Sequence, residues 1–163
     1  MDYLFQIGDK IVYPMQGAGI IKGIEEKEIS GTKQTYYLIH ILSNKMQVMI
    51  PSEKILNTGI RLVVDSPTLE DVLLNFQGKE LYTNESLTHK ERYQINMDKI
   101  RTGRLKEGFE VVHDLLLLNS KKPLNTSEKQ MLSTARKILV GEMALIKGIT
   151  ENQADDLLND SLN

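Results

Sequence analysis

The sequence lacks several features that would assign it to a large class of proteins. It has 163 residues and no cysteine, which excludes disulfides, thiolate zinc sites and cysteine nucleophiles together. No uncharged apolar run approaches the roughly 20 residues of a membrane-spanning helix, and the opening MDYLFQIGDK lacks the basic start and apolar core of a signal peptide. No Gly-Lys-Ser/Thr phosphate loop occurs, which argues against ATP hydrolysis. We therefore expect a cytoplasmic protein without a membrane segment.

The chain also lacks a large excess of charge of either sign. The 20 basic and 22 acidic residues give a net charge of −2, which by itself argues against a nucleic-acid-binding protein. The charges are segregated, however: residues 79–106 carry seven basic and four acidic residues, 120–148 carry six and two, and 151–163 carry four acids and no base. A local basic face is therefore possible, although ordinary solvated helix faces explain the same pattern.

The first third of the chain has the composition of β-strands. Between residues 9 and 51, four segments rich in Ile, Val and Tyr are separated by short turn-forming stretches: DKIVYP, GIIKGIEEKEI, TYYLIHIL and KMQVMIP. Pro51 ends the last segment because it cannot donate a hydrogen bond to a strand ladder. Four short strands with tight connections predict a small, strongly bent sheet or barrel.

Beyond about residue 62 the apolar period changes from two to 3.6, which predicts helices. Thr88 and Glu91 match a capping box, in which each side chain satisfies an otherwise unpaired amide. Asn125 and Glu128 repeat this pattern before a long helix. The sequence therefore predicts an α+β chain with the β-structure first: a small β-barrel domain at residues 1–62, then an all-helical domain of about five helices at 63–163.

The glycines at positions 17 and 19 raise the question of a phosphate-binding loop. A dinucleotide loop requires three glycines between a strand and a helix, whereas Gly17-Ala18-Gly19 has two and leads into another strand. We therefore interpret both glycines as structural, allowing backbone angles or close approaches that a Cβ atom would forbid.

No group of side chains suggests catalysis or a metal site. The three histidines, His40, His89 and His113, lack any two-histidine ligand spacing, and we expect His113, beside Asp114, on a helix surface. Paired acidic residues are sequence neighbours, and nothing places them across a cleft from one another. We therefore predict no enzyme activity, no catalytic residue, no metal, no cofactor and no small-molecule substrate.

The last predicted strand contains two of the seven methionines. Alternation places Met46, Val48 and Ile50 on one face, and Gln47 and Met49 on the other. The simpler interpretation is a core face with an incidental surface. The alternative is that this strand lies at a sheet edge and offers its backbone to another chain, with Met49 as an adaptable contact.

Four motifs together make the chain resemble the CarD/CdnL family of bacterial transcription regulators. They are GDKIVYPMQGAGII at 8–21, VMIP at 48–51, RYQINMDKIRTG at 92–103 and EKQMLSTARKILVGEMA at 128–144. The first motif is shared with the polymerase-interacting domain of the transcription-repair coupling factor. That enzyme is a large translocase, whereas this chain is short and lacks the nucleotide loop, so the CarD/CdnL family is the better match.

The resemblance implies a Tudor- or SH3-like first domain that binds the β1 lobe of the RNA polymerase β subunit. It also implies a helical domain that contacts promoter DNA at the upstream edge of the transcription bubble, so that the open complex is stabilised. Met49 stands where some relatives carry arginine, which suggests a more apolar contact. The polymerase-binding residues that the resemblance implies are Lys27, Met46, Gln47, Val48, Met49 and Ile50.

For the helical domain the resemblance implies DNA contacts by His89, Lys90, Arg92, Lys129 and Arg136, with Lys121 or Lys122 as a further helper. The chain has no tryptophan, and His89 stands where relatives carry one that wedges into the opened duplex. Imidazole buries less apolar surface than indole, so we expect a weaker wedge. For Arg136, a structural ion pair with Glu142 or an acid on a neighbouring helix is an equally good interpretation.

With so few phosphate contacts, we expect DNA binding to be weak, salt-dependent and mainly non-specific, and tethering to polymerase to make it useful. Two alternatives stay open. A non-enzymatic interaction adaptor would use the helical domain to bind another protein, with its basic stretches as solvated surface. A hydrolase would require a cleft that gathers histidines and carboxylates that the sequence keeps apart.

Overall fold

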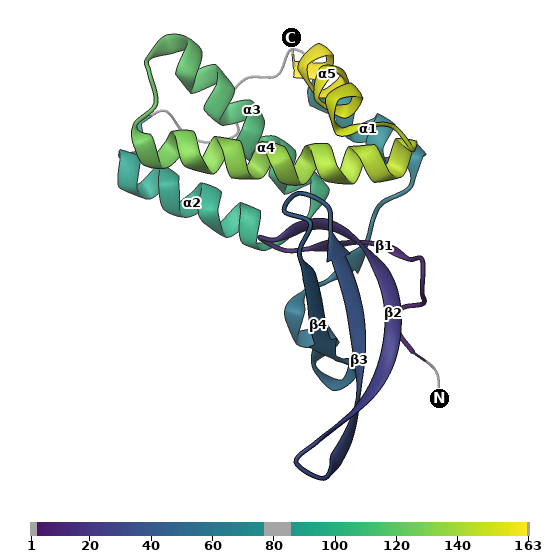
Figure 1. Ribbon diagram of the computed structural model, residues 1–163. Coiled ribbons are helices and arrows are strands. Elements are labelled where there is room, and N and C mark those ends of the chain that lie inside the picture. The colour runs from purple at the N-terminus through teal and green to yellow at the C-terminus, as the bar shows by residue number, and fades with distance from the viewer. Residues whose placement is uncertain (1–2, 77–85, 163) are drawn as a thin grey trace.

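The computed structural model describes residues 3–76 and 86–162, in which a curved sheet precedes a group of helices (Figure 1). This order confirms the predicted α+β fold with the β-structure first. The elements are β1 (Lys10–Tyr13), β2 (Gly17–Ile29), β3 (Thr32–Ile41), β4 (Gln47–Pro51), the short 3-10 helix η1 (Ser52–Thr58), β5 (Arg61–Leu62), α1 (Ser66–Phe76), α2 (His89–Arg101), α3 (Leu105–Lys121), α4 (Thr126–Lys147) and α5 (Glu151–Leu162).

The strands form one antiparallel sheet in the order β4-β3-β2-β1-β5. Alternation sends Tyr37, Ile39 and Ile41 of β3 into one apolar core, where they meet Ile11 and Ile21. The sequence pattern missed β5 because a strand of two residues is too short to show a period. In this strand order, β4 and β5 are the two edges of the sheet.

The glycines at the start of β2 have the structural role that the sequence predicted. Gly17 has a φ of +111°, a backbone conformation that side chains with a Cβ rarely adopt. A Cβ atom on Gly19 would lie 2.7 Å from the carbonyl oxygen of His40 on β3. Gly17 therefore makes the tight corner between β1 and β2, and Gly19 permits the close approach of β2 to β3.

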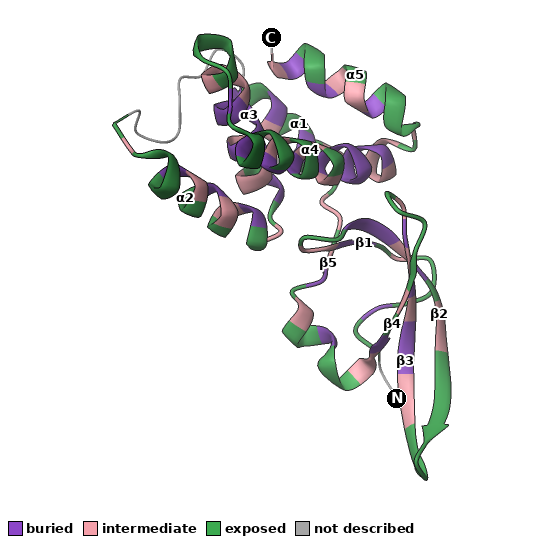
Figure 2. Ribbon diagram, turned by 60° about the vertical axis from the view of Figure 1, so that its left-hand side comes forward, coloured by how far each residue is buried: buried purple, intermediate pink, exposed green. Residues whose placement is uncertain are grey.

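The outer halves of β2 and β3 form a two-stranded hairpin that projects beyond the sheet core and is exposed along most of its length (Figures 1 and 2). Ser30 and Gly31, at its tip, both have positive φ angles of 54° and 78°, as two-residue hairpin turns of type I′ require. Lys27 lies on this hairpin, opposite Gln34.

The helices pack around α4, which runs through the middle of the helical domain (Figure 1). Its buried face includes Ala135, Leu139 and Met143. The prediction of a surface position for His113 was wrong: its side chain is 5% exposed and packs against Phe76, with 5.7 Å between the ring centroids. The neighbouring Asp114 suggested a polar surface, but α3 is buried around most of its circumference at this point, so His113 and Asp114 are both buried.

The two predicted helix starts are both present but differ in detail. Thr88 and Glu91 form the full reciprocal capping box of α2. At the start of α4, Asn125 accepts a hydrogen bond from the backbone amide of Glu128, but the Glu128 carboxylate does not turn back to the cap. It is used elsewhere, in a contact between helices. No helix in the described ranges is both long enough and apolar enough to cross a membrane.

Candidate docking edge and nucleic-acid interface

The strand predicted to bind another chain is an edge of the sheet. In the described part of the chain, β4 pairs only with β3. The backbone amide of Ile41 donates to the carbonyl oxygen of Met46 across this pair. In an antiparallel ladder, hydrogen-bonded positions alternate with positions whose N–H and C=O groups face away. Because Ile41 pairs with Met46, the backbone groups of Val48 and Ile50 face β3, and those of Gln47 and Met49 face the free edge.

The side chains divide in the same way except at Met46, whose carbonyl oxygen pairs with β3 but whose side chain is exposed. Ile50 is buried in the sheet core and Val48 packs against it, so both side chains face the core, and their contact with polymerase stays a prediction. Met46 and Met49 are exposed, with exposed fractions of 55% and 40%. The Lys27 ammonium lies 3.7 Å from the Met49 sulfur, across β3. We call Lys27, Met46, Gln47 and Met49 the docking edge.

The implied DNA contacts gather, with one exception, at one end of the helical domain. Glu128, in the first turn of α4, contacts His89, the first residue of α2, so the N-termini of both helices lie side by side. Lys90 and Lys129 are exposed beside them. Each helix N-terminus carries a partial positive charge that favours phosphate. We call His89, Lys90 and Lys129, together with Lys122 at the end of α3, the helical tip.

A groove of about 250 Å³ runs between the elements of the helical tip. Lys122 and Pro123 form part of its wall, with Leu118 and Leu124 providing apolar surface. Lys121 or Lys122 is the helper cation that the resemblance implies, and of these two Lys122 lines the groove, because the end of α3 returns to the starts of α2 and α4.

Arg92 is bonded within the protein in this arrangement, and its contact with DNA stays a prediction. Its Nε atom donates to Glu128 Oε2 at 2.8 Å and its Nη2 atom donates to Oε1 at 2.9 Å. Both side chains are buried, Glu128 to 1% exposure. Arg92 and Glu128 therefore form a two-bond ion pair that joins α2 to α4 and gives the helical tip its shape.

The same pair shifts the titration of both partners. Burial alone raises the pKa of Glu128, but hydrogen bonds and charge attraction from Arg92, and then His89, outweigh burial and lower it overall. The hydrogen bond to Glu128 raises the pKa of Arg92. His89 Nδ1 lies 2.8 Å from Arg92 Nη2 and 3.1 Å from Glu128 Oε1. That nitrogen accepts from Arg92 in one tautomer and donates to Glu128 in the other, while 59% of the imidazole surface is exposed.

Arg136 is the exception to the gathering at the helical tip, two turns further along α4. Its Nε atom donates to Asp155 Oδ1 of α5 at 2.8 Å, and its Nη2 atom contacts Asn159. The structure thus has the ion pair with an acid on a neighbouring helix that the sequence analysis considered, while Glu142 pairs with Arg61 instead. Lys129 and Arg136 share one helix face, but α5 occupies that face at Arg136.

Within residues 3–76 and 86–162, no group of three or more His, Asp or Glu side chains could hold a metal ion. Of the described carboxylates that are buried, Glu128 and Glu142 are each paired with an arginine, and Asp114 Oδ1 lies 3.4 Å from His113 Nδ1. The geometry offers two candidate binding surfaces, one made of strand backbone and one made of helix N-termini and cations.

Comparison with known proteins matches both halves of the chain. The family model described as the CarD-like/TRCF RID domain matches residues 5–64, and the model described as the CarD C-terminal domain matches residues 71–159. The Bacillus subtilis (strain 168) protein YdeB, named as a candidate transcription factor, is 51% identical over 150 residues, which are 92% of this chain and 97% of YdeB.

Two solved structures from Myxococcus xanthus are similar to the first part of the chain. One is the solution structure of the 72-residue N-terminal domain of CarD, with 32% identity, a TM-score of 0.31 and coverage of 38% of this chain and 83% of that domain. The other is CdnLNt, with 44% identity, a TM-score of 0.33 and coverage of 39% of this chain and 90% of its own.

Proposed function

Because the chain belongs to the CarD family of bacterial transcription regulators, we propose that it binds the β1 lobe of the RNA polymerase β subunit through its docking edge and contacts promoter DNA through its helical tip. In this function the helical tip meets the upstream edge of the transcription bubble and stabilises the open complex. The protein acts in the cytoplasm, on the nucleoid, without an enzymatic step or a cofactor.

The observation that carries the polymerase contact is the free edge of β4. The outward backbone groups of Gln47 and Met49 offer hydrogen bonds in the direction in which a partner strand would add. Main-chain bonds of this kind supply affinity, and neighbouring side chains supply specificity. Lys27 and Met49 combine a cation with an adaptable apolar surface beside this edge.

Substitution of Met49 by proline tests this contact. Proline removes the Met49 amide, which faces away from β3, so the internal ladder keeps its hydrogen bonds while the edge loses a donor. We expect Met49→Pro to lose at least about tenfold in affinity for the isolated β1 lobe in a pull-down or titration, and Met49→Ala to lose less.

Leu56→Ala on η1 is the matched control, because Leu56 is exposed but lies off the sheet edge. Circular dichroism shows whether Met49→Pro keeps its fold, and Gln47→Pro repeats the test at the other outward amide. Full affinity of two folded proline variants would contradict strand addition at β4.

The DNA contact is supported by the two helix N-termini and the exposed Lys90 and Lys129. A combined Lys90→Ala and Lys129→Ala variant removes both cations and leaves the Arg92–Glu128 pair intact. We expect it to bind the β1 lobe normally and to lose most of the open-complex stabilisation, measured as complex lifetime after competitor challenge. Arg92→Ala is unsuitable for this test, because it would leave Glu128 buried without a partner.

His89 allows the opposite test. Its imidazole is more than half exposed at the helical tip, so His89→Trp adds apolar surface where the DNA fork is placed. We expect a longer open-complex lifetime in the same assay. An unchanged or shorter lifetime would contradict the position assigned to His89.

A protein-interaction adaptor is the second candidate function. The ion pairing of Arg92 and Arg136 favours it, because two of the five implied DNA contacts are used within the protein. If the Lys90→Ala and Lys129→Ala variant stabilises the open complex as well as the wild type, the adaptor becomes the better assignment.

A further inference from the structure

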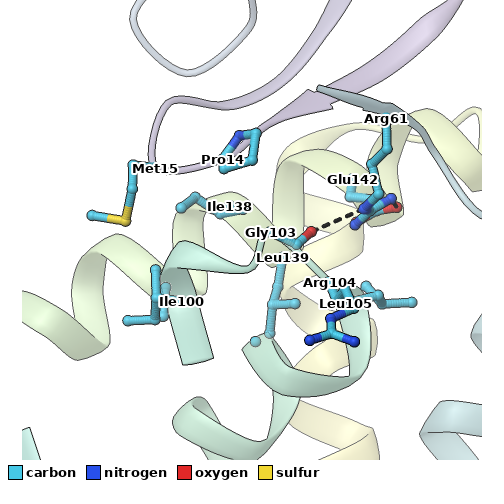
Figure 3. A pocket seen from close by; sticks show the side chains of 12 residues that line it. Pro14, Met15, Arg61, Ile100, Gly103, Arg104, Leu105, Ile138, Leu139 and Glu142 are labelled. Atoms are coloured by element: carbon cyan, nitrogen blue, oxygen red, sulfur yellow. Dashed lines mark hydrogen bonds and ion pairs between the residues drawn. The ribbon is translucent and has the colours of Figure 1, made fainter. Parts of the chain in front are cut away.

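A second ion pair, partly buried, lies at the junction between the sheet and the helices. Arg61, on the edge strand β5, donates from Nη1 to Glu142 Oε2 at 2.8 Å and from Nη2 to Oε1 at 2.7 Å, and Figure 3 shows the two side chains together beside Gly103. Glu142 lies in the C-terminal third of α4 and is 1% exposed. The two parallel bonds fix the direction as well as the distance between strand and helix.

The same two side chains also bond the backbone of two other segments. The amide of Val64, in the chain that leads from β5 to α1, donates to Glu142 Oε2 at 3.2 Å. The Nε atom of Arg61 donates to the carbonyl oxygen of Gly103 at 2.9 Å. Gly103 follows the last turn of α2. One ion pair therefore joins the sheet, the connecting segment, α4 and the C-terminal end of α2.

The surfaces around this pair are closely packed. A Cβ atom on Gly103 would lie 2.7 Å from Pro14 Cγ, and one on Gly141 would lie 3.3 Å from the Ala18 Cβ. The cavity beside the pair has a volume of about 20 Å³, which is room for a single water molecule. The sheet and the helices therefore pack closely around the ion pair, and we call this contact the joint.

The joint connects the two proposed binding surfaces. Gly103 follows α2 at one end, and His89 and Lys90 begin α2 at the other, about 20 Å away for a helix of this length. We propose that Arg61 and Glu142 are positioning residues that hold the helical tip at a fixed place relative to the docking edge. The functional half of this inference rests on the proposed function: a chain bound to polymerase then presents its tip to DNA without a search over orientations.

The structural half can be tested on the isolated protein. Because the chain has no cysteine, Lys54→Cys on η1 and Asp156→Cys on α5 create two unique sites for spin labels. We expect electron–electron distance measurements to give one narrow distribution for this protein. Glu142→Gln keeps the shape of the side chain but removes its charge, and we expect it to broaden or shift that distribution.

Lys99→Met is the matched control, because it breaks the partly buried Lys99–Glu110 pair inside the helical domain, which spans 3.1 Å. We expect it to leave the distribution unchanged. If Glu142→Gln does not fold, the double variant Arg61→Leu and Glu142→Leu removes both charges together and avoids an unpaired buried group. A folded variant of either kind with the unaltered distribution would overturn the positioning role.

The functional half is tested with polymerase and promoter DNA. We expect Glu142→Gln to keep its affinity for the β1 lobe and for forked DNA within about twofold, but to shorten the open-complex lifetime at least about fivefold. A lifetime like that of the wild type, together with an altered distance distribution, would overturn the link between orientation and function. Failure of the wild type to bind the β1 lobe would refute the proposed function but leave the distance test of the joint unaffected.

Discussion

The docking edge and the helical tip differ in the part of the residue that makes the contact. At the docking edge the outward N–H and C=O groups of Gln47 and Met49 are available whatever the side chains are. At the helical tip the contact depends on cations, and Arg92 is already bonded to Glu128 within the protein. The comparison shows that the outward backbone groups of a strand can be identified from the alternation of its residues. A basic residue can be assigned to a DNA contact only after its partners within the protein are known.

The two regions also differ in how they are held in place. The sheet rests on an apolar core. By contrast, α2 buries Arg92, Asn96 and Ile100, two of which are polar, against the rest of the helical domain. A buried charge that loses its partner is far more costly than an apolar side chain that loses a contact. The shape of the helical tip therefore depends on polar groups being paired.

Removal of the Glu128 carboxylate tests most directly whether the helical tip depends on this pairing. Glu128→Ala leaves Arg92 buried without its partner, and we expect the free energy of unfolding to fall by about 3–5 kcal/mol in urea denaturation. Lys129→Ala, at the neighbouring exposed position, should change it by less than about 0.5 kcal/mol. The double variant Arg92→Leu and Glu128→Leu should recover most of the loss. A Glu128→Ala variant as stable as the Lys129→Ala control would show that the pair does not hold α2.

Asn96 tests the same contact between α2 and its neighbours, but here a substitution is expected to increase stability. Its side chain is fully buried, and neither its Oδ1 nor its Nδ2 atom has a hydrogen-bond partner in the described structure. Asn96→Leu replaces these unsatisfied groups with an apolar side chain of similar size, so we expect a gain of about 1–3 kcal/mol. Gln94→Leu, on the exposed side of α2, is the control and should give no such gain. A destabilised Asn96→Leu variant would indicate that the amide is needed.

These side chains also show which features could be predicted from the sequence and which could not. Alternation and Pro51 placed the edge strand, and the two capping residues Thr88 and Asn125 placed the starts of α2 and α4, because all of these signals are local. The partners of Arg92 and Arg136 are 36 and 19 residues away, and no local pattern pairs them. The prediction of the fold was therefore better than the prediction of which cations are free.

The pH dependence of stability gives a smaller effect at the same pair. The pKa of Glu128 in the folded chain is below its ordinary value of 4.5: burial raises it, but the bonds from Arg92 and His89 outweigh burial. A carboxylate with a lowered folded pKa stabilises the fold fully above its unfolded pKa, and this stabilisation is lost as the pH falls through the folded pKa.

We therefore expect the free energy of unfolding to fall on acidification below about pH 4.5, and to fall less steeply in Glu128→Gln. The effect is smaller than that of Glu128→Ala because a protonated carboxyl still fills the site. Urea denaturation of both proteins between pH 7 and pH 3 measures the difference between their free energies of unfolding. The other carboxylates are the same in both proteins, so their contribution cancels in this difference. Parallel pH profiles for the two proteins would be inconsistent with a lowered pKa of Glu128.

Arg136 and Lys129 give the finest comparison, because they share a helix face but differ in their partners. The Arg136–Asp155 pair is partly exposed, so Arg136→Ala should cost no more than about 1 kcal/mol of stability. Lys129 is exposed at the helical tip, so Lys129→Ala should weaken binding to forked DNA and reduce its salt slope by about 1. Arg136→Ala should leave that slope unchanged, because α5 already neutralises its charge. A reduced slope in Arg136→Ala would mean that the guanidinium leaves Asp155 when DNA binds, and would extend the interface along α4.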